Sequence, residues 1–225
     1  MRSSQDAAAY LETLRSILLY IGVSDCKMQE GSLRCDVNVS IRPEGQKEFG
    51  VRTEMKNVNT FSGAIRGIEY EIKRQTEVLE SGGTVMQETR RWDDGLGESL
   101  PMRSKEDAQD YRYFPEPDLL PIVIKPETVE KLRAQLPELP HVKKQRYKAE
   151  YHLSDYDISL LTESRDTAEF FEAAIGAGAA PKAAANWMMG DISRILKEKM
   201  IEITQVPFTP QQLAEMILLI ENGTI

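Results

Sequence analysis

Charged residues that could hold a metal ion and a phosphate follow two predicted strands near the start of the chain. Apolar and polar residues alternate without a break over residues 33–42, which is typical of a strand with one buried and one open face. Residues 49–56 predict a second strand, with Phe49 and Val51 on its buried face. Residues 43–47 contain a proline and a glycine, so we expect them to form the loop of a β-hairpin.

The length of this loop sets which residues of the two strands face each other, because a slip by one residue would turn an apolar set outward. The predicted pairs are Arg42 with Glu48, Asn38 with Arg52, Asp36 with Glu54, and Arg34 with Lys56. Like charges then lie opposite each other on the open face, which destabilises a hairpin. A divalent cation with a bound phosphate would satisfy both the acidic and the basic pair. The alternative is an ordinary solvated face on which acids and bases pair diagonally.

The composition is that of an ordinary globular protein and argues against several classes. The 225 residues are 41% apolar and 28% charged, which is enough for a sizeable core. The net charge of −8 argues against a general nucleic-acid binder held by charge alone. No apolar run is long enough to span a membrane and no signal peptide is recognisable, so we expect a cytoplasmic protein without a membrane partner. Cys26 and Cys35 are the only cysteines, which is consistent with a reducing compartment.

Helices and a second hairpin are predicted to frame these strands. One helix is expected to begin at Ser4 as its N-cap and to end near Gly22, and a longer helix to cover residues 60–81. The charged side chains of the longer helix are interpreted mostly as a solvated face; they are Glu69, Glu71, Lys73, Arg74 and Glu77. A second hairpin is predicted from strands at 84–92 and 98–103. These elements together predict an α+β unit.

A proline-rich segment follows at residues 110–118. Its two prolines and Pro121, which follows shortly after it, fall within seven residues and favour an extended chain over a helix. Its aromatic side chains, Tyr111, Tyr113 and Phe114, lie next to an arginine and carboxylates. This segment could line a ligand pocket or could cover the edge of the sheet.

The chain beyond Pro126 is predicted to be helical. The predicted helices cover residues 126–135, 138–151, 154–163, 166–176, 181–200 and 210–221. Capping boxes are expected where Asp166 precedes Glu169 and where Thr209 precedes Gln212. The basic run at 141–148 is either a solvated helix face or a contact for RNA phosphates. The lysines that would make that contact are Lys143, Lys144 and Lys148.

Familiar catalytic motifs are missing from the sequence. It contains no GxxxxGK[ST] phosphate loop, no HExxH pair and no CxxC pair, and no Ser-His-Asp spacing stands out. His141 and His152 lie in the helical part, far in sequence from either cysteine. Any chemistry would therefore depend on carboxylates, cations and a metal. Mg²⁺ fits best, because it is bound by one or two carboxylates together with substrate phosphates.

Several segments together resemble one enzyme family. Residues 28–40 are close to the pattern M-E-E-G-S-L-R-C-D-x-N-[VI]-S, and residues 54–61 resemble E-[ML]-K-N-L-N-S-F. Further matches lie at 87–90, 102–106, 110–118 and 186–190. Over nearly its whole length the chain is similar to the B subunit of the glutamyl-tRNA(Gln)/aspartyl-tRNA(Asn) amidotransferases. The resemblance implies part of an antiparallel-sheet, cradle-like α+β catalytic domain (1–124), an all-α helical domain (125–205) and the first helix of a tRNA-binding tail (206–225).

The resemblance also implies a reaction and partners. Such enzymes are carbon–nitrogen ligases that phosphorylate the side-chain carboxyl of mischarged Glu-tRNA(Gln) or Asp-tRNA(Asn) with ATP and Mg²⁺. Ammonia, released from glutamine by an amidase (A) subunit, then displaces the phosphate to give Gln-tRNA or Asn-tRNA. A small C subunit completes the heterotrimer.

The resemblance and the pairing argument together give a set of candidate site residues. Glu54 matches a carboxylate that the family uses near its metal, and Asp36 would be the second metal ligand. Both would also act in catalysis, because the chemistry needs charged groups that face ATP phosphates. The remaining candidates are Lys56 in catalysis and Arg34, Asn38 and Arg52 in nucleotide binding.

The chain departs from the family pattern in three places. Family members begin well upstream with a strand that carries a Glu-x-His motif, and no four-ligand zinc set is found here. Gln29 stands where the family usually has Glu. We therefore expect a chain that is truncated at both ends and does not catalyse the full reaction by itself. The alternative function is a non-catalytic tRNA-binding or scaffolding fragment built from the helical part.

Overall fold

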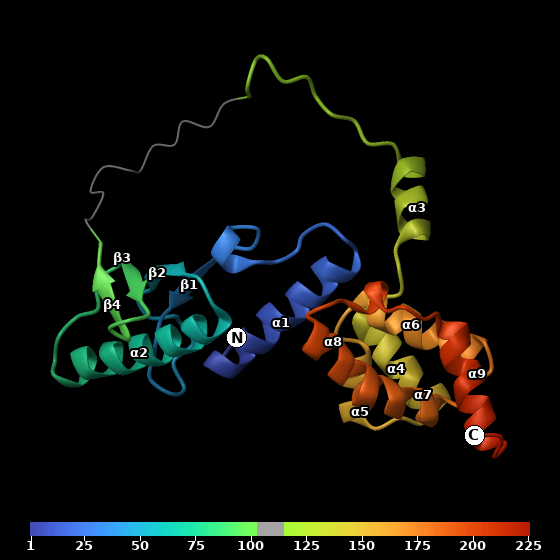
Figure 1. Ribbon diagram of the computed structural model, residues 1–225. Coiled ribbons are helices and arrows are strands. Elements are labelled where there is room, and N and C mark those ends of the chain that lie inside the picture. The colour runs from blue at the N-terminus through green and yellow to red at the C-terminus, as the bar shows by residue number, and fades with distance from the viewer. Residues whose placement is uncertain (103–114) are drawn as a thin grey trace. The chain divides into compact units, whose positions relative to one another are not determined.

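The chain divides into two compact units (Figure 1). Unit 1 consists of Met1–Arg15 and Ser24–Glu130, and unit 2 of Ser16–Val23 and Lys131–Ile225. The computed structural model describes residues 1–102 and 115–225. The aromatic residues Tyr111, Tyr113 and Phe114, for which a ligand pocket or an edge cover was predicted, lie outside the described residues.

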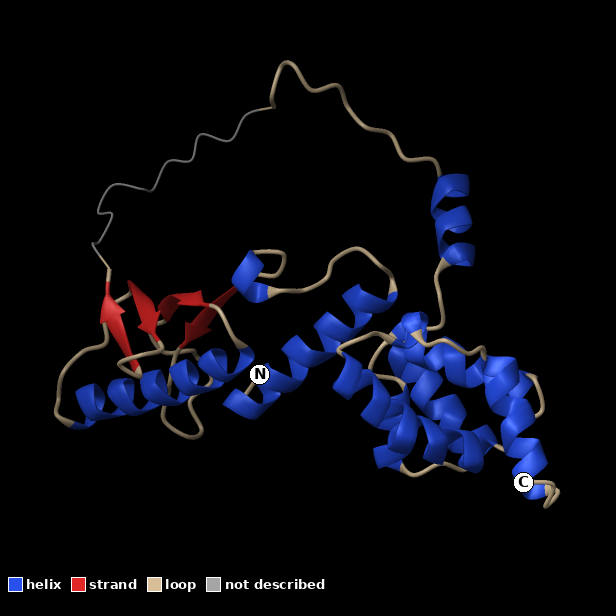
Figure 2. Cartoon of the chain, in the orientation of Figure 1, coloured by secondary structure: helices blue, strands red, loops and turns tan. Residues whose placement is uncertain are grey.

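Unit 1 contains one four-stranded sheet in the order β1-β2-β3-β4. The strands are β1 (Cys35–Val39), β2 (Thr53–Val58), β3 (Glu88–Asp93) and β4 (Glu98–Pro101). The outer pairs are antiparallel and the central pair, β2 with β3, is parallel. The helix α2 (Phe61–Glu80) connects this central pair, as a parallel pair requires (Figure 2). The predicted α+β class is confirmed, but the sheet is mixed instead of antiparallel, and the two predicted hairpins are joined into one sheet.

Helix α2 packs on one face of this sheet. Its N-cap is Thr60, whose hydroxyl accepts a hydrogen bond from the backbone N–H of Gly63 at 2.8 Å. At Gly67 a Cβ would lie 2.4 Å from Met55 Cε, so a larger residue there would require the buried Met55 side chain to shift. Met55 and Trp92 are almost fully buried in the small core that results.

The predicted hairpin is shorter than the sequence pattern suggested. Phe49 is 84% exposed and Val51 is 45% exposed, so the prediction that they face the core is wrong. The physical reason lies at Gly50, where a Cβ would be 2.0 Å from the carbonyl oxygen of Ile41. The backbone passes too close to Ile41 there for regular pairing, and β2 begins only at Thr53.

Three helical elements belong wholly or partly to unit 1. They are α1 (Ser4–Tyr20), the 3-10 turn η1 (Met28–Glu30) and α3 (Pro126–Gln135). The Ser3 hydroxyl accepts a hydrogen bond from the N–H of Asp6 at 3.0 Å. Ser3 therefore caps α1 in place of Ser4, which is fully buried and donates its hydroxyl to Glu69.

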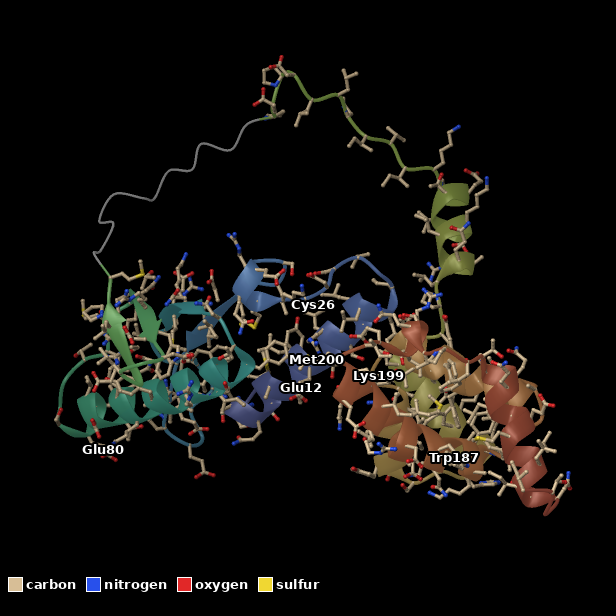
Figure 3. All side chains as sticks on the ribbon, viewed as in Figure 1. Glu12, Cys26, Glu80, Trp187, Lys199 and Met200 are labelled. Atoms are coloured by element: carbon tan, nitrogen blue, oxygen red, sulfur yellow. The ribbon has the colours of Figure 1, made fainter. Side chains whose placement is uncertain are left out.

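Unit 2 is entirely helical. Its elements are α4 (Pro140–Tyr151), α5 (Asp155–Leu161), α6 (Arg165–Gly176), α7 (Pro181–Trp187), the π-helical turn η2 (Met188–Ile192), α8 (Ser193–Lys199), the 3-10 turn η3 (Ile203–Gln205) and α9 (Pro210–Glu221). The core is built from Tyr147, Leu161, Phe171 and Ile217. The predicted helix at 181–200 is confirmed, with the π-helical turn in its middle. Met200 ends it in the left-handed conformation (φ 52°) and is exposed (Figure 3).

The two predicted capping boxes have different outcomes. At the start of α9 the Thr209 hydroxyl and the Gln212 side chain make both reciprocal hydrogen bonds, which confirms that box. The predicted box at Asp166 and Glu169 is wrong. Ser164 caps α6 instead, because its hydroxyl accepts the N–H of Thr167 at 3.1 Å.

Candidate functional site

The open face of β1 and β2 gathers three of the predicted site residues. Asp36 on β1, and Glu54 and Lys56 on β2, alternate with the more buried residues of the same strands. Their side chains are 54%, 36% and 45% exposed, respectively. The alternation in the sequence therefore predicted correctly which side chains share this face.

The pairing of the two strands differs from the predicted one. Asn38 lies opposite Glu54, and Val37 lies opposite Met55. The ladder is irregular between Cys35 and Val37, where β2 contributes one extra residue. The late start of β2 lengthens the loop and moves the register. The predicted pairs that are wrong for this reason are Asp36 with Glu54, Arg34 with Lys56, Asn38 with Arg52, and Arg42 with Glu48.

Opposite charges, instead of like charges, meet on this face. The ammonium nitrogen of Lys56 lies 3.9 Å from Asp36 Oδ2 and 3.8 Å from Glu54 Oε1. One cation thus lies near two carboxylates, and each pair is open to water and weak. The face needs no further ligand to relieve repulsion, so the candidate site has to be argued from its donors and its pocket.

The carboxylate of Glu54 has a second partner on the neighbouring strand. Thr89 lies beside Glu54 in the parallel β2–β3 ladder. Its hydroxyl donates a hydrogen bond of 3.0 Å to Glu54 Oε2. The two oxygens of Glu54 are therefore distinguished, since Oε2 faces Thr89 and Oε1 faces Lys56.

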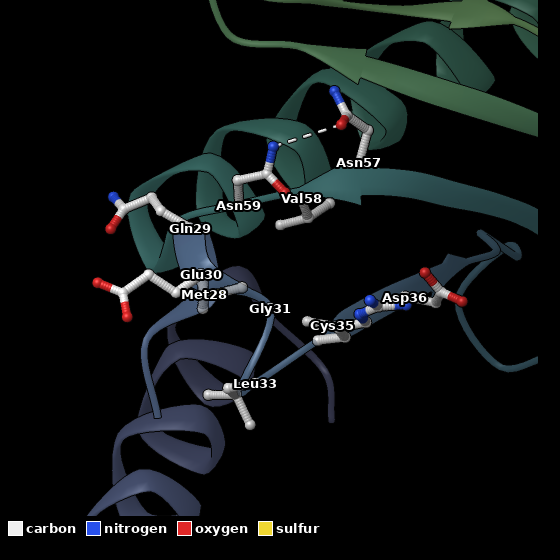
Figure 4. Close-up of a pocket in the computed structure, with 11 residues that line it drawn as sticks. Met28, Gln29, Glu30, Gly31, Leu33, Cys35, Asp36, Asn57, Val58 and Asn59 are labelled. Carbon is white, nitrogen blue, oxygen red and sulfur yellow. Dashed lines mark hydrogen bonds between the residues drawn. The ribbon is translucent and has the colours of Figure 1, made fainter. Parts of the chain in front are cut away.

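A pocket of about 430 Å³ lies at one end of the β1–β2 pair (Figure 4). Three segments line it: the η1 turn, the start of β1 and the end of β2. The lining residues are Met28, Gln29, Glu30, Gly31, Leu33, Arg34, Cys35, Asp36, Asn57, Val58 and Asn59. All of them belong to two of the stretches that resemble the amidotransferase B subunits, 28–40 and 54–61.

Asn57, the residue before the last of β2, has a backbone conformation that few residues adopt. Its φ is +64°, in the left-handed region that only glycine and, less often, asparagine or aspartate enter readily. Its amide nitrogen donates a hydrogen bond of 3.0 Å to the carbonyl oxygen of Trp92. Its amide oxygen accepts one of 3.3 Å from Asn59, which Figure 4 shows as a dashed line. Two amide side chains are thereby held in the wall of the pocket.

The three predicted nucleotide-binding residues do not lie together on the ribbon that β1 and β2 form. Arg34 lines the pocket beside Asp36. Arg52 is exposed just before β2 and does not line this pocket. Asn38 lies on a second, more apolar groove of about 640 Å³ that runs along β1 between α1 and α2. The structure therefore brings together Arg34 and Asp36, but not Arg34 and Arg52.

The donor set of this face suits a hard divalent ion only in part. In the described ranges, no three His, Cys, Asp or Glu side chains come together as a metal site. Asp36 and Glu54 offer two carboxylates, and Mg²⁺ is commonly held by one or two carboxylates with phosphate and water oxygens as its other ligands. Burial and the nearby Asp36 raise the pKa of the Cys35 thiol, and sulfur is a soft donor that a hard ion such as Mg²⁺ does not favour. Mg²⁺ that arrived with a nucleotide would thus find two carboxylate ligands on this face, Asp36 and Glu54.

A buried ion-pair network joins α2 to β3 and β4. Glu71 is fully buried and lies 2.9 Å from Arg74 Nη2 and 3.3 Å from Arg90 Nε. It also accepts a hydrogen bond from the Ser99 hydroxyl. Burial by itself would raise the pKa of Glu71, but the hydrogen bonds from Arg74 and Ser99 outweigh it and hold the pKa below its usual value. The interpretation of Glu71 as part of a solvated face is therefore wrong.

The basic run in α4 is in part an internal ion-pair cluster. Lys143 is 6% exposed, and its ammonium lies 2.6 Å from Glu172 and 3.4 Å from Glu138. Neither a solvated lysine nor an RNA contact describes this residue. Lys144 and Lys148 are exposed, and Lys148 pairs with Asp155 at 2.8 Å.

Sequence reasoning gave no role to Thr89, Asn57 or Asn59. Each lies inside a segment that resembles the family, at 87–90 or 54–61, so the resemblance was the available signal. Their contacts depend on which strands are neighbours and on how β2 ends. Neither property follows from the alternation of polar and apolar residues.

Comparison with known proteins identifies the family of the chain. The family profile described as "GatB/GatE catalytic domain" matches residues 1–130, and the profile described as "GatB domain" matches residues 169–225. The chain therefore belongs to the family of amidotransferase B subunits.

Curated relatives are similar over the whole chain. The B subunit of the aspartyl/glutamyl-tRNA(Asn/Gln) amidotransferase of Caldicellulosiruptor saccharolyticus is 56% identical over 228 residues, which cover 100% of this chain and 48% of that protein. The protein of the same name from Carboxydothermus hydrogenoformans is 51% identical over 225 residues, with 100% and 47% covered. The chain spans about half the length of the curated relatives it matches. Among the helices of the described residues, none is long and apolar enough to cross a bilayer.

Proposed function

We propose that unit 1 forms part of the site at which an aspartyl/glutamyl-tRNA amidotransferase uses ATP to activate the side-chain carboxyl of Asp or Glu on a mischarged tRNA. One observation carries the proposal. Two stretches that resemble the B subunits, 28–40 and 54–61, line a single pocket, and Asp36 belongs both to this pocket and to the charged cluster with Lys56.

The charged cluster of Asp36, Glu54 and Lys56 would bind the phosphates of the nucleotide. Asp36 and Glu54 would hold Mg²⁺, which when bound neutralises phosphate charge and polarises the phosphoryl group. Lys56, now shared between these two carboxylates, would turn toward a phosphate oxygen and stabilise the charge that develops there. Arg34 would bind a second phosphate from the wall of the pocket.

The amides of the pocket would orient the substrate. Asn57 is held by Trp92 and in turn holds Asn59, so both side chains are positioned before a ligand arrives. Prepositioned donors lower the cost of ordering a substrate in its reactive geometry. We propose that ammonia reaches the activated carboxyl from an amidase (A) subunit and that a small C subunit completes the complex. The chain by itself would bind nucleotide without completing the amidation.

Binding of Mg²⁺-ATP by the chain tests the proposal directly. We expect Glu54→Gln to weaken the binding of a fluorescent ATP analogue in the presence of Mg²⁺ by about ten-fold, because one charged ligand of the metal is lost. Glu48→Gln is the matched control, since Glu48 is an exposed glutamate of the loop before β2. It should leave the affinity unchanged.

Equal affinities for Glu54→Gln and the parent chain would overturn the nucleotide site. Retained binding of tRNA in both variants would then support the alternative, a tRNA-binding or scaffolding role. ATP-dependent amidation by the isolated chain would contradict the proposal that it requires partner subunits.

A further inference from the structure

The side chain of Thr89 touches the carboxylate on which the proposed site depends. The carboxylate of Glu54 has two partners, Thr89 on the neighbouring strand β3 and Lys56 on its own strand β2. Thr89 donates to its Oε2 at 3.0 Å, and Lys56 lies 3.8 Å from its Oε1. A hydrogen bond to one oxygen restricts the rotation of a carboxylate about its terminal C–C bond. The other oxygen then points in a defined direction.

Thr89 is itself held on both sides. It lies in the parallel ladder beside Glu54, and its carbonyl oxygen accepts the backbone N–H of Met102 at 3.0 Å. Its position is therefore set by the central strand of the sheet and not by the exposed face. A β-branched side chain on a strand also has few rotamers, which keeps the hydroxyl directed at its neighbour.

We infer that Thr89 is a positioning residue that holds the Glu54 carboxylate, with Oε2 fixed by the strand and Oε1 presented to a cation. The role of a divalent ion in this inference rests on the proposed function, whereas the hydrogen bond between Thr89 and Glu54 does not depend on it. Oε1 faces Lys56 in the free chain, and it would be available to a divalent ion that arrives with a nucleotide. The simpler explanation is that Thr89 is present only because threonine favours strands.

Two variants, one without and one with the hydroxyl, separate these explanations. Thr89→Val keeps the shape and the strand preference but removes the hydroxyl, whereas Thr89→Ser keeps the hydroxyl. The probe is Mn²⁺ in the presence of ATP, and its binding to the chain is followed by electron paramagnetic resonance of the Mn²⁺ ion. We expect Thr89→Val to weaken Mn²⁺ binding about five-fold, which corresponds to the loss of one hydrogen bond, and Thr89→Ser to stay within about two-fold of the parent.

A double-mutant cycle supplies a readout that a purely structural threonine would not move. The urea midpoint of unfolding is measured for Thr89→Val, Glu54→Ala and the combined variant. We expect Thr89→Val to lower the midpoint in the parent chain and to have no effect in the E54A background. Additive effects, or equal behaviour of Thr89→Val and Thr89→Ser, would overturn the inference.

The same experiments distinguish failure of the proposed function. If Glu54→Ala leaves the Mn²⁺ affinity unchanged, the metal role of the face is wrong. The unfolding cycle does not depend on metal, so it still decides whether Thr89 holds Glu54.

Discussion

Lys56 and Asp36 form an ion pair across the β1–β2 ribbon, with 3.9 Å between the ammonium nitrogen and a carboxylate oxygen. The same ammonium lies 3.8 Å from Glu54. A metal ion that binds these two carboxylates must therefore displace a resident cation. A nucleotide would provide the displaced ammonium with a new partner, which couples metal binding to phosphate binding.

This competition predicts opposite effects of Lys56→Met on two ligands. The variant should bind Mn²⁺ alone about two- to five-fold more tightly, because an exposed ion pair that opposes the metal is removed. It should bind Mg²⁺-ATP more weakly than the parent chain, because a phosphate partner is lost. Isothermal titration of both ligands checks the pair of signs. Weaker binding of Mn²⁺ alone would show that Lys56 does not compete with metal.

Asn57 predicts a characteristic order of stability among substitutions. Asn57→Gly should cost about 1 kcal/mol of unfolding free energy, because it loses the hydrogen bond to Trp92 but tolerates a φ of +64°. Asn57→Val should cost about 2–4 kcal/mol, because a β-branched residue adds strain to the same loss. Urea unfolding followed by circular dichroism measures both. A valine variant as stable as the glycine variant would rule out backbone strain at this position.

The open face was predictable from the sequence, but its pairing was not. Alternation placed Asp36, Glu54 and Lys56 on one side, because a strand turns successive residues to opposite faces. The register depended on where β2 begins. Phe49 and Val51 look like strand residues, yet the close passage of Gly50 beside Ile41 excludes them from the ladder.

Two other features carried signals that the pattern analysis did not use. Ile68, Glu71 and Gln75 are spaced by three and four residues and share the buried face of α2, so helical periodicity itself places Glu71 inward. The predicted helix at 60–81 was also long enough for the crossover that a parallel β2–β3 pair needs. A glutamate on the apolar face of a helix thus indicates a buried ion-pair network. A long helix between two strands indicates that these strands can pair in parallel.

Glu71 predicts a large loss of stability from a single substitution. Glu71→Ala should lower the free energy of unfolding by about 3–5 kcal/mol, because it removes the fully buried carboxylate that Arg74 and Arg90 share and leaves the half-buried Glu88 as their partner. Glu77→Ala, on the exposed side of the same helix, is the control and should stay within about 0.5 kcal/mol. Urea titration of both variants measures the difference. Similar losses in the two would mean that the buried network does not stabilise unit 1.

The pKa of Glu71 predicts how stability depends on pH. Its folded-state pKa lies below the ordinary value of 4.5, despite burial that would raise it, because Arg74 and Ser99 hydrogen-bond to the charged form. The stabilisation is therefore fully present above about pH 4.5 and is lost as the pH falls through the folded-state pKa. Unfolding free energies from pH 7 down to pH 3 should decline more gently in Glu71→Gln than in the parent chain. An identical decline would show that Glu71 is not among the groups that take up protons on acid unfolding.

Lys143 separates stability from nucleic-acid binding in the basic run of α4. Lys143→Gln should lower the free energy of unfolding by about 1–3 kcal/mol, because Glu172 and Glu138 lose a buried partner. It should leave the salt dependence of tRNA binding unchanged, since a lysine that is already neutralised by carboxylates releases no counterions from RNA. Lys144→Gln is the matched control at an exposed neighbour, with stability within about 0.5 kcal/mol of the parent. Filter binding of tRNA across a salt series gives the slope for both. A slope lowered by about 0.7 or more in Lys143→Gln, with folding intact, would place this lysine on an RNA phosphate after all.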